Sequence, residues 1–518
     1  MNKFKIIGAA FVLVFFASCV DDLNTEPKIE LTLDKLLEKD PKAVEGMVSK
    51  IYGTFALAGP NGPNEAADIQ GKDGGETAFL RGIINLQDFS ADGMKNRWGD
   101  DGLDQLTTTS GWSPNNKFFR YLFDRAYYTI PQSNNLINIL NTTKNTIPGK
   151  ENYIAELRFL RCLAYYYVID CFGKGPLVTE ADINTTTPKK ESTRKELFEF
   201  VEKDLLEAEK VITATKSYGK ANKAAVQMLL AKLYLNAEVY TGTARYNDAL
   251  TYVNKVIADS QYSLAPNYVS IFSGDNNTSP EIIYTLIADP LVSQSYGNTT
   301  YIVNGSLNVD TVDPNLFGAK DGWGGHRATK AWYGLFNGGD LVGSNDDRAK
   351  LFWTTGHSYE MNNYKTWTDG FPSVKFRNSN ATGTSISTSF SGTDFPLFRL
   401  ADAYLMYAEC VVRGATGGTS SQALTYVNAV ITRSKGDAIT APQLNLNFLI
   451  DERARELNLE GQRRTDLIRF GKFTGGSYLW PWKGGTKGGT SIPDTYKLYP
   501  IPTTALQSNA NLTQNPGY

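Results

Sequence analysis

Apolar side chains recur every three to four residues along several stretches of the chain, and this spacing places them on one face of an α-helix. These stretches are residues 41–58, 118–141, 151–172, 192–212, 221–237, 246–258, 400–412 and 421–432. Asp40 before Pro41 is a helix-start signal for the first stretch, and the Gly-Lys-Gly-Pro turn at 173–176 ends the third. The pattern predicts a mainly α-helical protein.

The last four stretches form two similar helical hairpins. Their second helices share the run Ala-Leu-Thr-Tyr-Val-Asn at 249–254 and at 423–428, and their first helices carry small residues where neighbouring helices approach closely. The pairs are similar to tetratricopeptide hairpins, although the two copies lie too far apart in the sequence for a regular array. We expect these tetratricopeptide-like hairpins to form a rigid scaffold.

Three stretches between the helices, 59–116, 263–397 and 474–518, are rich in Gly, Asn, Ser, Thr and aromatic residues. Short alternating runs at 281–286 and 301–303 predict a minor β content. Irregular stretches of this length are uncommon in compact domains unless they have a function. We therefore expect the binding site on long irregular loops that the helical scaffold displays.

The composition of the chain suits a globular protein and argues against nucleic acid as a partner. Its 518 residues are 41% hydrophobic and 20% charged, which is enough to build a large core. The 52 basic and 54 acidic residues nearly balance, and they form no long run of like charge. Binding to the phosphate backbone of a nucleic acid requires a clustered excess of positive charge.

The N-terminus has the form of a lipoprotein export signal. Lys3 and Lys5 precede an apolar run at 6–16, which is shorter than the ~20 residues that span a bilayer. Small residues then precede Cys19, as in a bacterial lipobox, so we expect residues 1–18 to be a signal peptide and Cys19 to be lipidated. The alternative is an ordinary signal peptide with a chance cysteine. Residues 19–30 are predicted to be a tether, and 31–518 a single domain.

The residue types needed for most kinds of catalysis are scarce. His326 and His357 are the only histidines, which excludes a multi-histidine metal site. The other cysteines, Cys162, Cys171 and Cys410, are odd in number, so a disulfide framework is not expected. Neither a phosphate-binding loop nor a dinucleotide fingerprint follows a strand. We expect a protein that is not an enzyme, with paired carboxylates for glycoside hydrolysis as the open alternative.

Four separate motifs, at 156–173, 395–404, 452–467 and 499–518, resemble those of the SusD/RagB family and stand in the family's order. The resemblance implies a surface lipoprotein of the outer membrane in a Bacteroidetes-type bacterium, and Asp21 and Asp22 resemble the surface-export signal of such lipoproteins. It also implies delivery of glycans, or in some members peptides, to a SusC-like TonB-dependent transporter. The arginines and glutamates at 452–464 have the spacing of ion pairs along one helix, which would stabilise the fold.

Several loop segments resemble those of the family's starch-binding member, in which an arc of aromatic rings holds a coiled α-glucan. The positions that match the ligand-binding residues are Trp98, Tyr296, Trp323, Asp73, Arg81 and Asp101. An indole or phenol ring can stack on the apolar face of a pyranose, while carboxylates and guanidinium groups bind its hydroxyls. Asp101 departs from the member's asparagine, and a carboxylate accepts hydrogen bonds but cannot donate them.

The same resemblance suggests a structural calcium ion, although no cofactor is required for binding a glycan. Asp275 and Asp394 are the candidate ligands, but a further acidic position near Asp394 is taken by Gly392 and the loop around Asp275 is shorter. The remaining tryptophans are assigned to packing: Trp112, Trp332, Trp353, Trp367, Trp480 and Trp482.

The leading hypothesis is a non-catalytic surface lipoprotein that binds starch or maltooligosaccharides, as α-glucans, and passes them to the transporter. The first alternative is a related protein that binds another glycan or peptides. A glycoside hydrolase and a scaffold for protein interactions are two further alternatives.

Overall fold

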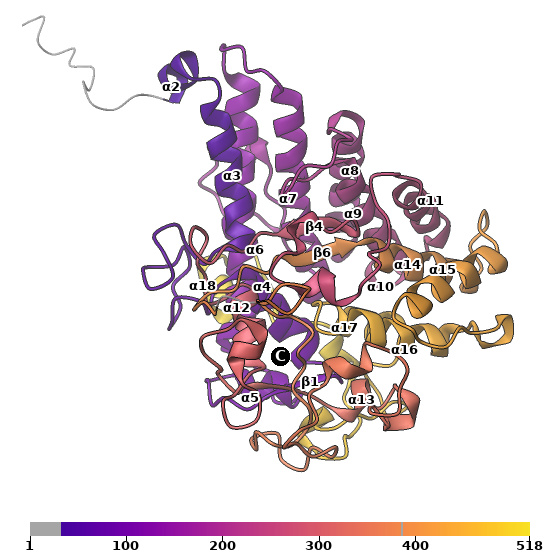
Figure 1. Cartoon of the computed structure of the whole chain (residues 1–518). Helices are drawn as coiled ribbons and strands as arrows, with labels where there is room; N and C mark the ends of the chain where they lie inside the picture. Colours follow the sequence, from indigo (N-terminus) through magenta and orange to yellow (C-terminus); the bar gives the residue numbers. More distant parts are fainter. Residues whose placement is uncertain (1–32, 385–386) are drawn as a thin grey trace, which may run out of the picture.

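The computed structural model describes residues 33–384 and 387–518, so the signal peptide, Cys19 and the tether lie outside the described residues. The protein is mainly helical, as the periodicity of the sequence predicts, with short two-stranded sheets between the helices (Figure 1). Among the helices of the described residues, none is both long enough and apolar enough to cross a membrane.

Four long helices form one side of the molecule (Figure 1). They are α3 (Ala43–Ala56), α6 (Lys117–Thr142), α7 (Lys150–Cys171) and α8 (Arg194–Val211). The helix α7 packs against α3, α6 and α8, and from Ile154 to Cys171 every residue except Arg158 is buried. A helix that is covered on all sides carries apolar residues around its whole circumference, which explains the weakly polar sequence of this segment.

The two predicted hairpins lie side by side. The first is α9 (Lys223–Leu235) with α11 (Tyr246–Ile257), and the second is α14 (Leu400–Val412) with α15 (Ser420–Arg433). Contacts between α11 and α14 join the two hairpins, and α8 packs on α9, so that α6, α7, α8, α9, α11, α14 and α15 form one continuous layer. The long insertion between α11 and α14 leaves this layer and folds beside it (Figure 1).

One of the two β-runs predicted from the sequence is confirmed and the other is wrong. The first is β4 (Ile282–Leu286), which pairs antiparallel with β6 (Phe395–Arg399). Residues 301–303 lie instead in α12 (Thr299–Gly305), where the side chain of Asn298 caps the helix by accepting from the backbone N–H of Thr299. Every residue of α12 is buried, so its sequence lacks the polar face that would have revealed a helical period.

The irregular stretch at 59–116 contains short helices and one strand, and this strand pairs with a segment much later in the chain. They are α4 (Phe79–Ile83), a π-helical turn (Ile84–Phe89), β1 (Met94–Asn96) and α5 (Leu103–Thr107). Strand β1 pairs antiparallel with β5 (His326–Ala328), with Asn96 opposite His326. The remaining elements are α2 (Leu33–Lys39), α10 (Ala237–Thr241), α13 (Lys330–Tyr333), α16 (Leu446–Leu457), α17 (Arg463–Arg469), α18 (Thr503–Ser508), and the pair β2 (Gly175–Pro176) and β3 (Glu191–Ser192).

The charged motif on α16 and α17 stabilises long-range contacts more than its own helix. Arg455 pairs with Glu452, three residues earlier, as predicted. Arg453, in contrast, pairs with Asp402 at 2.9 Å and with Asp466 at 2.7 Å, and both acids lie outside its helix. The prediction of ion pairs along one helix is therefore wrong for Arg453, because these side chains point into the interior where α14, α16 and α17 meet.

Glu456 is the centre of this buried network. Its carboxylate accepts from Arg399 at 2.6 Å, from Arg348 at 2.9 Å, and from Arg433. Three arginines around one acid hold the pKa of Glu456 well below its usual range, although burial alone would raise it.

The three described cysteines, Cys162, Cys171 and Cys410, are free and buried.

Candidate functional site

The three aromatic residues that the sequence singled out meet in one place. The ring centres of Trp98 and Trp323 are 6.3 Å apart, and those of Tyr296 and Trp323 are 6.2 Å apart. Each of the three side chains is partly buried, so one part of each ring packs on the protein while another part faces solvent. We call Trp98, Tyr296 and Trp323 the aromatic platform.

Strand pairing and a glycine fix the position of Trp98. Pairing of β1 with β5 continues through the backbone bond from Arg97 N–H to the Gly325 carbonyl, at 3.1 Å. The indole then lies directly on Gly325, where an added Cβ would come within 2.4 Å of the Trp98 Cε2 atom. Glycine at 325 is therefore needed for the close approach of the Trp98 ring to the backbone. The sequence shows glycines beside Trp323, but it does not show that one of them makes room for Trp98.

Buried rings form the floor of the platform. Trp98 packs on His326 at 5.0 Å and on Tyr301 at 5.8 Å between ring centres. Burial holds the pKa of His326 well below its usual range, and the nearby guanidinium groups of Arg81 and Arg327 lower it further. The imidazole beneath Trp98 is therefore uncharged at neutral pH, and the rings of the floor carry no charge.

The other end of the platform depends on a second close approach. A Cβ added at Gly75 would lie 2.6 Å from the Tyr296 Cβ atom, so the loop around Asp73 packs tightly on the loop of Tyr296. The ring of Phe390 lies 4.9 Å from that of Tyr296 and is buried, so it supports the Tyr296 ring from the protein side. Sequence reasoning missed Phe390, because a single phenylalanine in a Ser- and Thr-rich loop is usually a packing residue.

Arg81 links the acidic residues at the rim. Its guanidinium group lies 3.4 Å from a carboxylate oxygen of Asp73 and 3.4 Å from one of Asp100, and it covers the ring of Tyr301 at 4.7 Å. The sequence predicts Asp73, Arg81 and Asp101 as hydrogen-bond partners of the ligand, and the structure pairs Arg81 with Asp73 and with Asp100. A contact between Asp101 and a ligand stays a prediction. Asp101 is exposed on the turn before α5.

Lys365 is a second residue that the sequence did not indicate. Its ammonium group donates to the backbone carbonyl of Trp98 at 3.1 Å and forms an ion pair with Asp104 on α5. It thereby ties the platform to the loop at 361–370. A lysine in a polar turn gives no signal for such a role, since lysines in turns are mostly solvated.

The arrangement suits binding of a ligand that has both apolar faces and hydroxyl groups. Rings offer surfaces for stacking, while the carboxylates of Asp73 and Asp100, which the buried guanidinium group of Arg81 holds in place, offer charged hydrogen-bond partners at the rim. The second histidine, His357, is not part of this arrangement: its ring nitrogens form hydrogen bonds with the Thr311 hydroxyl and with the backbone carbonyl of Gly370.

Four of the tryptophans assigned to packing are buried, as predicted: Trp112, Trp332, Trp367 and Trp480. Trp353 and Trp482 are only partly buried. Trp482 packs against Tyr364 with ring centres 4.9 Å apart, and Trp353 packs against Phe317 at 6.0 Å. These two residues therefore retain a surface that can meet a ligand.

The candidate calcium ligands are engaged by the backbone. Asp275 accepts from the N–H of Ala381 at 3.0 Å, and Asp394 accepts from the N–H of Ala288 at 2.8 Å. Within residues 33–384 and 387–518, no group of three or more His, Cys, Asp or Glu side chains is arranged to hold a metal ion. The geometry adds no support for calcium, which stays a prediction.

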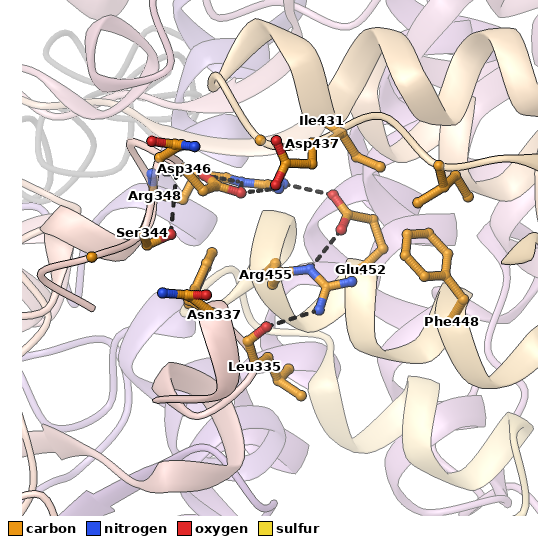
Figure 2. Close-up of a pocket in the computed structure, with 15 residues that line it drawn as sticks. Leu335, Asn337, Ser344, Asp346, Arg348, Ile431, Asp437, Phe448, Glu452 and Arg455 are labelled. Carbon is orange, nitrogen blue, oxygen red and sulfur yellow. Dashed lines mark hydrogen bonds and ion pairs between the residues drawn. The ribbon is translucent and has the colours of Figure 1, made fainter. Parts of the chain in front are cut away.

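A separate pocket of about 190 Å³ lies between the loop at 335–348 and the helices α15 and α16 (Figure 2). Charged side chains line it, and all of them except Asp437 pair with other residues of the lining. Arg348 bonds to Asp346 and to Glu452, each at 2.7 Å, and Arg455 bonds to Glu452 and to the Leu335 carbonyl. Apart from Asp437, the charged groups of this pocket are thus satisfied by the protein.

Comparison with known proteins places the chain in a family. Residues 344–518 match the model of the SusD family, and residues 86–235 match a model described as "Starch-binding associating with outer membrane". The starch-binding protein SusD of Bacteroides thetaiotaomicron is 32% identical over 99% of this chain and 98% of its own length. A SusD-like protein P38 of Formosa agariphila is 24% identical over 91% of this chain and 93% of its own length.

Solved structures share the fold. A SusD superfamily protein from Bacteroides vulgatus matches with a TM-score of 0.72 and 19% identity, over 92% of this chain and 99% of its own. The surface glycan-binding protein A of Bacteroides thetaiotaomicron, in complex with laminarihexaose, matches with a TM-score of 0.69 and 22% identity over 92% and 99% of the two chains. From its sequence and its fold, this chain belongs to the SusD family.

Proposed function

We propose that the protein is a non-catalytic, glycan-binding lipoprotein of the cell surface, and that its ligand is an α-glucan such as starch or a maltooligosaccharide. The observation that carries this proposal is the aromatic platform, in which three rings from distant loops meet above a polar rim. The relative that is 32% identical to this chain is named a starch-binding protein, and this name supports the same ligand.

The shape of the platform favours a curved ligand. The ring planes of Trp98 and Trp323 differ by 53°, and those of Tyr296 and Trp323 differ by 51°. Successive rings therefore turn instead of lying in one plane, and a ligand that stacks on all of them must bend. An α-1,4-linked glucan coils, so each of its sugar rings can meet one ring of the platform. Tyr and Trp lose little side-chain entropy on binding, which makes such a surface efficient.

Calorimetry can test this proposal. The wild-type protein should bind maltoheptaose, and it should bind a cyclic α-glucan at least as tightly, because the cyclic ligand is already curved. Trp98→Ala should weaken both interactions by at least about tenfold, the loss expected for about 1.4 kcal/mol of stacking. Tyr218→Ala is the matched control, because Tyr218 is 50% exposed and lies outside the platform.

The alternative ligands are another glycan or a peptide, and laminarihexaose is the first to compare because a structural neighbour is solved with it. Binding of laminarihexaose without any binding of α-glucans would replace the α-glucan proposal. Amylopectin incubated with the protein should yield no new reducing ends. New reducing ends that depend on Asp73 or Asp100 would instead show a glycoside hydrolase.

The proposal includes a lipid anchor at Cys19 and delivery of the glycan to a SusC-like TonB-dependent transporter. Cys19→Ser should abolish incorporation of labelled fatty acid and release the protein from the outer membrane. No cofactor is required in this scheme. Bound calcium at Asp275 or Asp394 would appear as a lower unfolding temperature after treatment with a chelator, with glucan affinity unchanged.

A further inference from the structure

A second cavity, of about 440 Å³, lies where the end of α15 meets the loops at 347–353 and 374–377. Its size falls within the range of pockets that hold small organic ligands, ~300–1,000 Å³. Four basic residues and one acidic residue line it, namely Lys350, Arg377, Arg433, Lys435 and Asp347. Asp347 pairs with Lys350 and with Lys435, each at 2.7 Å, and Arg433 pairs with Glu281 and Glu456 outside the lining.

Arg377 has no carboxylate partner in the part of the chain that the structure describes. One of its terminal nitrogens donates to the Val374 carbonyl at 2.7 Å, and its guanidinium group covers the ring of Phe317 at 5.4 Å. Its Nε atom is buried without a hydrogen-bond partner. Burial lowers the pKa of Arg377 to about 10, with no nearby acid to offset this cost. A partly buried cation without a counter-charge is costly, and an anionic ligand would relieve that cost.

Three more lining residues carry unused polar atoms. The Nε1 atom of Trp353, the Nε atom of Arg433 and the hydroxyl of Ser434 are buried without a partner within the described residues. Native proteins leave few such groups unpaired, which distinguishes this lining from most of the protein interior. Each of these atoms is shielded from solvent, so a ligand in the cavity can bond to it only after its side chain turns. In the pocket of Figure 2, by contrast, no side chain has a buried polar atom without a partner among the described residues.

The cavity also has an apolar wall. Trp353 is partly exposed and packs edge-on against Phe317, with ring planes at 85°. Tyr268, Leu351 and Val374 complete this wall. A small inorganic anion would satisfy the donors but leave the wall against water. A ligand that fills the site needs both an acid group and a flat apolar face.

We propose that this cavity binds an acidic sugar of the uronic acid class, with its carboxylate on Arg377 and its pyranose ring against Trp353. The planar guanidinium group matches a carboxylate, and the indole matches the C–H face of the sugar. None of the lining residues belongs to the aromatic platform, so the site is separate from the one proposed for α-glucan.

Calorimetry on the full chain with glucuronate, glucose and inorganic phosphate tests this site. Glucuronate should bind at least tenfold more tightly than either glucose or phosphate, and Arg377→Gln should weaken it at least tenfold. Trp98→Ala should leave glucuronate affinity unchanged, which separates this result from the α-glucan proposal. Equal binding of glucuronate and glucose would overturn the role of the carboxylate. Equal binding of glucuronate and phosphate would overturn the sugar and leave a simple anion site.

Thermal unfolding controls for loss of the fold. Because Arg377→Gln removes a desolvated charge that has no partner, the variant should melt no lower than the wild type. Glucuronate should raise the melting temperature of the wild type but not that of Arg377→Gln. Trp353→Phe provides a second variant that keeps a ring against Phe317 but offers the sugar a smaller aromatic face, and it should weaken glucuronate several-fold. Wild-type affinity in both variants would overturn the proposal.

Discussion

The indole nitrogen of Trp98 donates a hydrogen bond of 3.1 Å to the backbone carbonyl of Trp323, 225 residues further along the chain. The bond ties the indole ring of Trp98 to the backbone of Trp323, and so it links two residues of the platform. The orientation of Trp98 is thus fixed before any ligand arrives, and less entropy is lost when a ligand binds. The platform is a preformed surface, which explains why a tryptophan is stable on an acidic, glycine-rich loop.

Gly325→Ala should disturb this preformed surface selectively. The added methyl group would lie 2.4 Å from the Trp98 Cε2 atom, so the indole must move and its bond to Trp323 must lengthen. We expect α-glucan affinity to fall at least about tenfold, and the free energy of unfolding to fall by about 1–3 kcal/mol from overpacking. Calorimetry and tryptophan fluorescence measure the two effects.

Gly99→Ala is the matched control for this variant. Gly99 follows Trp98 directly, but a Cβ added there meets nothing within 4 Å. Its glucan affinity and its fluorescence should equal those of the wild type. A similar loss of affinity in both variants would show that the loop as a whole, rather than the position of the indole, determines binding.

Substitutions at Asp100 and Asp101 should distinguish a residue that positions Arg81 from one that contacts the glycan directly. Asp100→Asn weakens an ion pair with Arg81 whose acid is 36% exposed, so we expect a loss of at most about 1 kcal/mol in stability. Asp101→Asn should change the unfolding free energy by less than about 0.5 kcal/mol, because Asp101 is exposed. We expect it to alter glucan affinity, since an amide can also donate to a hydroxyl. Unchanged affinity in Asp101→Asn would remove Asp101 from the site.

The sequence predicted the long helices well because their apolar faces repeat with the helical period. It failed where burial is complete, as in α12, since a segment covered on all sides shows no period. The aromatic platform could be predicted only through resemblance to a family. The positions of Trp98 and Trp323 depend on the pairing of β1 with β5, which are far apart in the chain and three residues long each.

Charged residues were the hardest to place from the sequence. Asp100 and Asp101 are chemically identical neighbours, and only the turn before α5 decides which one faces Arg81. The ion pairs of α16 show the same difficulty. Spacing along a helix predicts pairs on its surface, but Arg453 points inward and finds Asp402 and Asp466 instead. Tertiary packing determines such partners, and it leaves no local pattern.

Glu456→Gln should destabilise the fold strongly. The variant leaves the buried guanidinium groups of Arg348, Arg399 and Arg433 with one fewer counter-charge. Removing one partner from a buried ionic network costs about 3–5 kcal/mol. Denaturant unfolding measures this loss. Glu207→Gln is the control, because its pair with Lys210 is exposed, and it should unfold as the wild type does. Equal midpoints for the two variants would contradict a structural role for the network.

His326→Phe should change how stability depends on pH. The folded protein keeps His326 neutral, because burial holds its pKa well below the ordinary value of about 6.5, whereas the unfolded chain titrates near that value. Below pH 6.5 the unfolded chain therefore binds a proton that the folded chain does not, and stability falls with pH.

The lost stability amounts to about 2 kcal/mol between pH 7.5 and pH 5, because the slope approaches about 1.4 kcal/mol per pH unit below the unfolded pKa. The His326→Phe variant lacks this pH-dependent contribution to stability. His357 is present in both proteins, so its contribution cancels in the comparison. Whatever the new ring costs at pH 7.5, the wild type's advantage should therefore shrink by about 2 kcal/mol at pH 5. Urea unfolding at the two pH values measures it. A difference that stays constant would mean that His326 is protonated in the folded state, and that the floor beneath Trp98 carries a charge.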